Sequence, residues 1–322
     1  MKTRDLGRTG LQVSEIGFGA WGLGATMWRG VSDEQGADTV RAALDAGVTF
    51  IDTALAYGDG HSERIVGRAA PAATIATKIP PNGGGWPAQP DSNIDEVFPA
   101  AYVRACTERS LANFGRPAID VQQFHVWHDV WLDQQGWKAT RAEMEKLKAE
   151  GRVRHWGISI NDHAPETALR ALQDPIFETA QVIYNIFDRS PEKELFSLAR
   201  ERGLGIIVRV PFDEGALTGA IRPDTAFPEG DWRHRYFRGN RRAEAAKRAD
   251  ALKALLGDEA KTLPELALRF ILSRPEVATV IPGMRRSEHA RANAAVSDGR
   301  ALSPEMLDRL RAHAWDKNWY VD

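Results

Sequence analysis

Four residues with acid–base chemistry stand at or just after the ends of short apolar segments: Asp52, Tyr57, Lys78 and His125. A phenol titrates at about 10 in water, too high for an effective proton donor at neutral pH, and a nearby ammonium lowers that pKa. Lys78 is predicted to supply this charge to Tyr57, and Asp52 to keep Lys78 protonated and in place. Neutral His125 would then orient a substrate carbonyl while Tyr57 protonates its oxygen.

These side chains could deliver a proton, but they hold no hydride. A nicotinamide cofactor is therefore implied, and the predicted reaction is the reversible reduction of an aldehyde or ketone to an alcohol. One alternative is a lyase or aldolase in which Lys78 forms a Schiff base with a carbonyl substrate.

The elements that must position these residues alternate along the chain between short β-branched segments and longer helical ones. The predicted strands span residues 15–20, 49–53, 74–79, 121–126, 153–159, 180–184, 205–210 and 278–282. The predicted helices span residues 33–46, 61–70, 99–114, 140–150, 165–173, 191–202, 241–256, 263–273 and 287–297, with a terminal helix at 304–314. Eight such units predict a single (β/α)8 TIM barrel over residues 1–322, and an open doubly wound sheet is the alternative.

Three segments fall outside this repeat. Residues 3–13 are predicted to form a β-hairpin that turns at residues 8–10 and lies under the barrel. Residues 80–98 and 213–240 are predicted to be long loops, and both follow the end of a strand, on the face where barrel enzymes carry their active sites. The predicted substrate pocket consists of Trp21, Trp28, Tyr57, Trp86, His125 and Trp127. For Trp28, Trp86 and Trp127, packing in the core is the alternative.

Composition excludes several classes of function. The 322 residues carry a formal net charge of −2, so neither nucleic acid nor an anionic membrane surface is an expected partner. The single cysteine, Cys106, rules out an internal disulfide. No signal peptide or apolar run of about 20 residues is visible, which predicts a cytoplasmic protein. His125 and His128 lack a carboxylate or cysteine cluster at metal-ligand spacing, so no metal site is expected.

A glycine pattern at residues 17–22 matches the dinucleotide fingerprint GxGxxG. A Rossmann fold requires a helix directly after this fingerprint, and none is predicted there. Instead, the chain resembles the aldo-keto reductase family over essentially its whole length. The segments that carry the resemblance are residues 6–21, 50–54, 57–63, 76–78, 123–125, 155–159, 180–185 and 280–286. The resemblance implies a barrel, a monomer, bound NADP(H), and a catalytic tetrad at Asp52, Tyr57, Lys78 and His125. The second alternative is a nicotinamide-binding regulatory subunit without turnover, similar to the potassium-channel β subunits. Those subunits resemble the same family.

The resemblance also implies a set of cofactor contacts. These are Gly19, Ala20, Trp21, Asp52, Ser159, Gln181, Arg209, Val210, Pro211, Phe212, Gly215, Leu217, Gly283, Met284, Arg285, Arg286, His289 and Asn293. Ser159 and Gln181 would bind the carboxamide. Arg285 and Arg286 precede a predicted helix N-terminus, a natural site for a 2′-phosphate, which favours NADP(H) over NAD(H).

Two positions depart from the family pattern. Ile160 follows Ser159 where an asparagine is usual, with Asn161 one residue later. Arg209 stands where an aromatic residue usually stacks on the nicotinamide, and a guanidinium plane can also stack.

Overall fold

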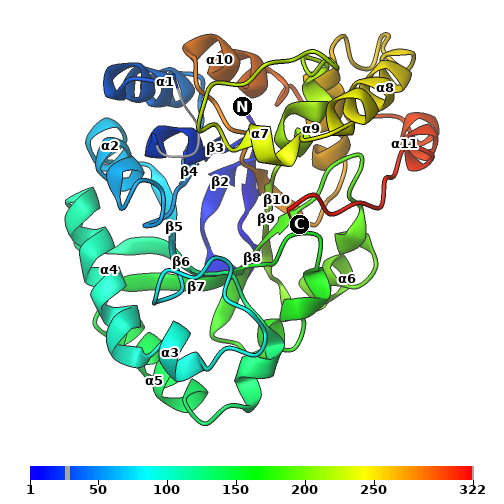
Figure 1. Ribbon diagram of the computed structural model, residues 1–322. Helices are drawn as coiled ribbons and strands as arrows, with labels where there is room; N and C mark the ends of the chain where they lie inside the picture. Colours follow the sequence, from blue (N-terminus) through cyan, green and yellow to red (C-terminus); the bar gives the residue numbers. More distant parts are fainter. Residues whose placement is uncertain (26–29, 321–322) are drawn as a thin grey trace.

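The computed structural model describes residues 1–25 and 30–320, and its centre is a barrel of parallel strands (Figure 1). The strands are β3 (Phe18–Gly19), β4 (Phe50–Asp52), β5 (Thr74–Ile79), β6 (Ile119–His125), β7 (Val153–Ser159), β8 (Phe177–Ile183), β9 (Gly205–Arg209) and β10 (Val277–Val280). Each pairs with the next in chain order, giving an 8-stranded sheet. Bridges from Ile16 to Val280 and from Gly19 to Gly283 join the first strand to the last. The predicted TIM barrel is confirmed.

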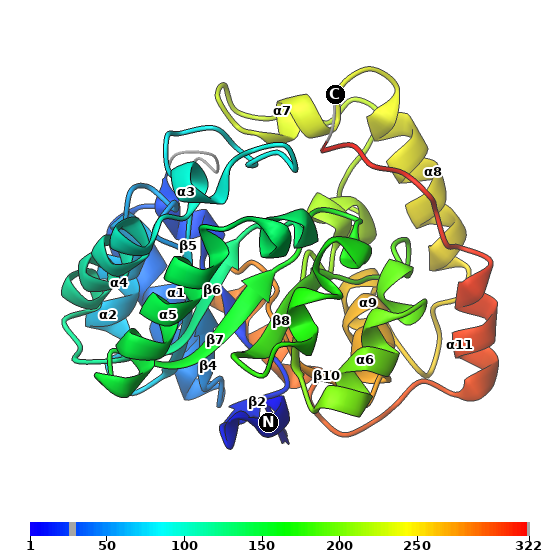
Figure 2. The same ribbon diagram turned by 90° about the horizontal axis from the view of Figure 1, so that it is seen from below.

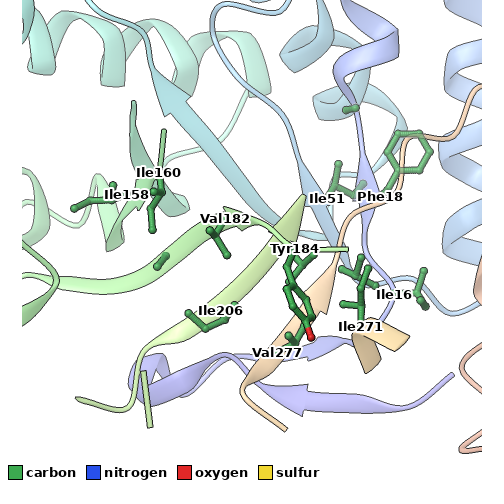
Figure 3. Packing of buried hydrophobic residues seen from close by; sticks show 14 of the residues in the cluster. Ile16, Phe18, Ile51, Ile158, Ile160, Val182, Tyr184, Ile206, Ile271 and Val277 are labelled. Carbon is green, nitrogen blue, oxygen red and sulfur yellow. The ribbon is translucent and has the colours of Figure 1, made fainter. Parts of the chain in front are cut away.

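Helices surround the barrel and follow most of its strands. They are α1 (Asp33–Asp45), α2 (His61–Ala69), α4 (Ala100–Phe114), α5 (Trp137–Ala149), α6 (Leu195–Arg202), α8 (Arg241–Lys253), α9 (Leu263–Leu272), α10 (Ser287–Ala295) and α11 (Pro304–Arg311). Side-chain caps fix several starts: Ser32 and Gln35 form a capping box on α1, and Thr262 caps α9. Aliphatic residues of neighbouring strands, such as Ile158 and Val182, pack in one core with helix residues such as Ile271 (Figure 3).

One predicted helix is wrong. Residues 165–173 form two short 3-10 helices, Pro165–Ala168 and Ala171–Gln173, instead of a continuous α-helix. The carboxylate of Asp129 accepts hydrogen bonds from the backbone amides of Arg170, at 2.6 Å, and Ala171, at 3.0 Å. The Asp129 side chain thus accepts hydrogen bonds from two backbone amides. In a continuous helix, these amides would donate to carbonyls of the preceding turn.

The predicted N-terminal hairpin is confirmed, and it lies at the end of the barrel opposite α7 (Arg233–Tyr236) and the C-terminus (Figure 2). Strands β1 (Thr3–Asp5) and β2 (Gln12–Ser14) are antiparallel. Leu6 and Val13 from the hairpin pack on interior barrel residues such as Phe50 and Val121, which excludes water from this end of the barrel.

The two long loops leave the other end, where the strands terminate. They are largely irregular but include α3 (Ile94–Val97), α7 and a 3-10 helix at Asp213–Thr218. Among the described residues, no helix is long and apolar enough to cross a membrane.

Candidate active site

The four predicted acid–base residues meet at one mouth of the barrel. Asp52 is the last residue of β4, Lys78 lies one residue before the end of β5, and His125 is the last residue of β6. Parallel strands place these ends together, and Tyr57 follows on the loop after β4. The ring centroids of Tyr57 and His125 lie 6.1 Å apart.

Lys78 and Asp52 form a buried ion pair at the centre of this group. The Lys78 ammonium donates to Asp52 Oδ1 at 2.6 Å and to the Thr53 carbonyl at 2.8 Å, and its side chain is 0% exposed. Burial raises the pKa of Asp52 and lowers the pKa of Lys78, and the charge of each partner opposes the shift of the other. The short contact favours the ionised pair, because each charge is stabilised by its neighbour.

A further hydrogen bond orients the carboxylate of Asp52. The side-chain amide of Gln181 donates to Asp52 Oδ2 at 2.6 Å. We expected Gln181 to bind a nicotinamide carboxamide, and in the structure its Nε2 atom serves the ion pair. Both Asp52 oxygens therefore have a donor on the protein, which fixes the carboxylate plane.

The expected effect of Lys78 on the acidity of Tyr57 is not what the structure supports. The Lys78 nitrogen lies over the phenol ring, 5.2 Å from its centroid, and its charge is neutralised by Asp52. Burial raises the pKa of Tyr57, the Asp52 charge raises it further, and the Arg209 guanidinium lowers it. The phenol is therefore fully protonated at neutral pH, and Arg209 is the cation that opposes the increase.

His125 is poised as a neutral hydrogen-bonding group. Burial lowers its pKa well below the ordinary value, and the positive charges of Lys78 and Arg209 lower it further. Its Nδ1 atom is buried and has no hydrogen-bond partner within the described part of the chain. The edge of Trp86 packs against its ring, with centroids 4.4 Å apart.

Aromatic side chains rim the mouth, but not all of those predicted from sequence. Trp86 is 54% exposed beside His125, and Trp21 lies 6.3 Å from Tyr57 between ring centroids. Trp127 is instead 0% exposed and packs in the core against Trp131, so we leave it out of the proposed pocket. The predicted contribution of Trp28 lies outside the described residues.

The segment after β9 has an unusual backbone. Val210, Asp213, Glu214 and Gly215 have φ values of 54°, 46°, 56° and 108°, a region that residues other than glycine rarely adopt. Such conformations persist where surrounding contacts impose them, and they cluster at ligand sites. Burial raises the pKa of Glu214 to about 7.

Arg209 is anchored to the loop after β7. Its guanidinium donates to the Ile160 carbonyl at 2.9 Å and to Asp162 at 2.7 Å. The amide of Asn161 donates to Thr167 in its own loop at 3.2 Å and to the Trp127 carbonyl in the loop after β6, so its nitrogen is already engaged. The buried hydroxyl of Ser159 is left without a partner among the described residues, as a group awaiting a ligand would be.

Several of the predicted cofactor contacts surround the start of α10, including the two arginines predicted for the 2′-phosphate. Arg286 occupies the N-cap with extended backbone, and its side chain makes no capping hydrogen bond. Arg285 is half-buried, Arg286 and His289 are exposed, and Asn293 is buried. The positive end of a helix dipole together with two adjacent guanidiniums suits a phosphate dianion.

The other residues predicted to contact the cofactor differ in what their side chains could reach. Leu217 and Met284 are buried in the core, so only their backbone atoms remain for a ligand. Gly19 lies close to the backbone after β10. A Cβ atom at this position would lie only 2.6 Å from the Ile281 carbonyl oxygen. Gly283 is exposed, and a Cβ atom there would meet nothing within 4 Å.

Sequence reasoning did not assign roles at the mouth to several residues that lie there. Trp232, from the long loop before α7, has its ring 6.1 Å from Trp21 and stacks on Tyr320 of the C-terminal segment. Glu214 accepts a hydrogen bond from the Tyr320 hydroxyl. The sequence signal was the aromatic content of segments outside the barrel repeat, and it did not indicate which part of the mouth they reach.

Comparisons with known proteins define the class as an oxidoreductase. A model described as the aldo/keto reductase family matches residues 15–314. The aldo-keto reductase YhdN of Bacillus subtilis (strain 168) is 30% identical over 295 residues, which are 89% of this chain and 86% of that protein. The NADH-specific methylglyoxal reductase of Escherichia coli (strain K12) is 30% identical over 330 residues, which are 96% of this chain and 99% of that protein.

Solved structures agree with this classification. The aldo-keto reductase AKR11C1 from Bacillus halodurans, in its holo form, superposes with a TM-score of 0.76 at 28% identity and covers 98% of this chain and 96% of its own. The glycerol dehydrogenase AKR11B4 from Gluconobacter oxydans also has a TM-score of 0.76 at 28% identity, covering 94% and 92% of the two chains. The chain belongs to the aldo/keto reductase family, as its sequence motifs predicted.

Proposed function

We propose that the protein reduces aldehydes or ketones to alcohols with NADP(H), using Tyr57 as the proton donor. The observation that carries this proposal is the ion pair of Lys78 and Asp52 beside Tyr57 and His125 at one barrel mouth. A protonated phenol and a neutral imidazole are both hydrogen-bond donors toward a carbonyl oxygen. As the oxygen becomes an alkoxide, Tyr57 transfers its proton to it, and the Arg209 guanidinium, which lowers the pKa of Tyr57, stabilises the negative charge left on the phenol oxygen.

The residues around the mouth fit a nicotinamide dinucleotide. When bound, this group would supply the hydride. Ser159 has a buried hydroxyl available for the carboxamide, and the left-handed backbone at residues 213–215 offers a turn that could wrap the diphosphate. The N-terminus of α10 with Arg285 and Arg286 would hold the 2′-phosphate.

The two alternative functions are less well supported. A Schiff-base lysine must lose its proton and reach the substrate, whereas Lys78 is 0% exposed and hydrogen-bonded to Asp52 and a backbone carbonyl. A regulatory subunit without turnover could keep the same four residues, so activity measurements must separate it from an enzyme.

Turnover is the direct test. We expect the purified protein to consume NADPH steadily when sugars, aromatic aldehydes and ketones are supplied one at a time, and the matching alcohol to accumulate in equal amount. Tight NADPH binding without turnover on any carbonyl would support the regulatory function, and trapping of a substrate on Lys78 by borohydride would support the lyase.

Cofactor preference tests the proposed 2′-phosphate site, and the relative named NADH-specific methylglyoxal reductase makes NADH the cofactor to compare. We expect Arg285→Ala with Arg286→Ala to reduce the NADPH-to-NADH ratio of kcat/KM about 10- to 100-fold, because charge-assisted hydrogen bonds to the phosphate are lost. The matched control is Arg291→Ala, an exposed arginine further along α10, which should leave the ratio unchanged. An unchanged ratio in the double variant would refute the site.

A further inference from the structure

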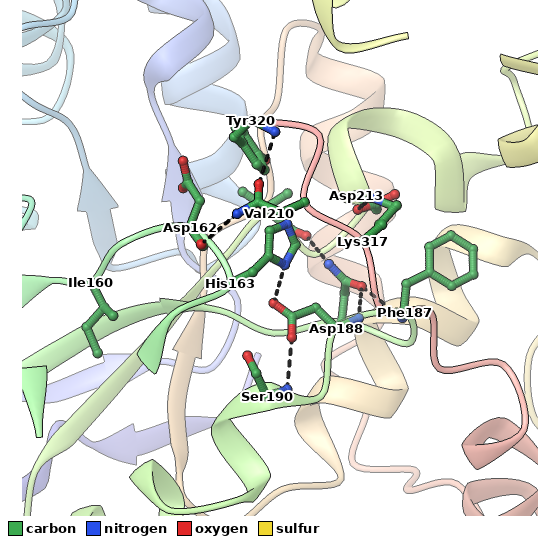
Figure 4. A network of polar contacts seen from close by, with 12 residues as sticks. Ile160, Asp162, His163, Phe187, Asp188, Ser190, Val210, Asp213, Lys317 and Tyr320 are labelled. Atoms are coloured by element: carbon green, nitrogen blue, oxygen red, sulfur yellow. Dashed lines mark hydrogen bonds and ion pairs between the residues drawn. The ribbon is translucent and has the colours of Figure 1, made fainter. Parts of the chain in front are cut away.

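The C-terminal segment, residues 315–320, lies beside the left-handed turn at residues 213–215. Figure 4 shows Lys317 and Tyr320 of this segment next to Val210 and Asp213. More than one hundred residues separate the partners in sequence: Lys317 and Asp213 are 104 apart, and Tyr320 and Glu214 are 106 apart. The contacts are therefore tertiary and not a consequence of chain proximity.

Lys317 makes the first contact, and it is buried. Its ammonium lies 2.8 Å from Asp213 Oδ1 and 2.9 Å from the Tyr236 hydroxyl, and the Lys317 and Asp213 side chains are 5% and 1% exposed. The same ammonium lies 4.5 Å from the ring centroid of Trp319. Because both charges are removed from water, separating them would leave an unpaired buried carboxylate at the turn.

Tyr320 makes the second contact. Its hydroxyl donates to Glu214 Oε1 at 2.6 Å, and its ring stacks on Trp232 with centroids 5.4 Å apart. The amide of Asn318 donates to the Asp162 carbonyl at 3.3 Å, which ties the C-terminal segment to the loop that anchors Arg209. Adjacent residues of the turn are thus each held by a different side chain of the C-terminal segment.

The turn has need of such contacts. Asp213 and Glu214 are not glycines, yet their φ values of 46° and 56° are followed by 108° at Gly215. A run of left-handed residues is disfavoured and persists only where tertiary contacts stabilise it. Within the turn, the Gly215 and Leu217 amides donate to the Phe212 carbonyl at 2.9 and 3.0 Å. The Asp213 carboxylate accepts from the Tyr236 hydroxyl at 3.2 Å as well as from Lys317, so the C-terminal segment and α7 together orient it.

We propose that Lys317 and Tyr320 are positioning residues that hold residues 213–215 in this conformation and thereby set how slowly a bound dinucleotide leaves. The inference rests on the proposed function, since residues 213–215 form the turn proposed to wrap the diphosphate. We call this role of the C-terminal segment a latch. When Lys317 and Tyr320 release residues 213–215, the strained turn relaxes and the bound dinucleotide leaves faster.

The charge arrangement favours the same role. Two adjacent carboxylates beside a diphosphate would repel it if they faced it freely. Lys317 neutralises Asp213, and the Tyr320 hydroxyl occupies an oxygen of Glu214, so both are directed toward the C-terminal segment. Loss of either contact therefore both loosens the turn and frees a negative charge near the proposed diphosphate.

Tyr320→Phe is the cleanest test, because it removes one hydroxyl and keeps the ring that stacks on Trp232. We expect NADPH to dissociate about tenfold faster from this variant in stopped-flow fluorescence, with a comparable or larger effect for Lys317→Met. Tyr102→Phe and Lys148→Met, on α4 and α5 at the outside of the barrel, are matched controls that should release NADPH at the original rate.

Hydrogen exchange of the protein without dinucleotide separates this inference from the proposed function. We expect peptides covering residues 210–219 to exchange faster in Tyr320→Phe than in the unaltered protein, while peptides from β4 to β6 do not change. Unchanged exchange, or faster exchange with an unchanged NADPH release rate, overturns the latch. Failure of the unaltered protein to bind NADPH or NADH overturns the proposed function, and exchange alone then shows whether the C-terminal segment holds the turn. If Lys317→Met fails to fold, Tyr320→Phe decides.

Discussion

Tyr57→Phe should reduce kcat for carbonyl reduction by about 10²- to 10⁴-fold, the usual contribution of a positioned proton donor. The phenylalanine ring keeps the contacts with Trp21 and His125 but has no proton to give to the alkoxide. Burial raises the pKa of Tyr57, so the unaltered phenol carries its proton at neutral pH, and the full difference between the two proteins should be seen there. The measurement is single-turnover NADPH oxidation with an aromatic aldehyde, which isolates the chemical step from release.

Affinity for the dinucleotide is the internal control for this variant. NADPH binding, followed by fluorescence titration, should be unchanged because the phenol hydroxyl is assigned to the substrate oxygen. Tyr102→Phe, which removes a hydroxyl on α4 remote from the mouth, should retain full activity. A Tyr57→Phe variant that binds NADPH normally and turns over at the original rate would refute the assigned role.

The four acid–base residues could be predicted from sequence because the ends of the strands can be located in it. Asp52, Lys78 and His125 each interrupt or end a β-branched segment, and parallel packing brings such ends to one mouth. The acidity of Tyr57 was not readable in this way. It depends on the depth of the phenol and on whether the Lys78 charge is already paired, and only the three-dimensional arrangement shows that Asp52 neutralises it.

Elements fixed by distant partners also escaped prediction. The helix expected at residues 165–173 is broken because Asp129, 41 residues before Arg170, accepts its backbone amides. Trp127 was assigned to the pocket, yet its ring packs in the core on Phe177 of β8, with centroids 5.9 Å apart. In the C-terminal segment, Lys317 finds Asp213 across 104 residues. No local pattern encodes these contacts, whereas the hairpin at residues 3–13 depends on near neighbours and was predicted.

Lys78→Met should have the second large effect, and it should appear in stability as well as in activity. Removing one partner of a buried ion pair leaves an uncompensated charge, and such changes cost about 3–5 kcal/mol. Asp52 would keep its hydrogen bond from Gln181 but lose its ion-pair partner. Its carboxylate would then have to be protonated or remain as an unpaired buried charge. We expect the free energy of unfolding in urea to fall by this amount, and carbonyl reduction to be lost.

A double variant separates the charge from the shape of the site. In Lys78→Met with Asp52→Asn, no charge remains at the centre of the mouth, and the asparagine oxygen can still accept from the Gln181 amide that now reaches Asp52 Oδ2 at 2.6 Å. Much of the lost stability should therefore return, because no uncompensated charge remains buried. Activity should not return, since the ammonium that lies 5.2 Å from the centroid of the Tyr57 ring is gone. If Lys78→Met alone unfolds at the original urea concentration, the pair contributes no net stability, and its place at the mouth is explained by chemistry alone.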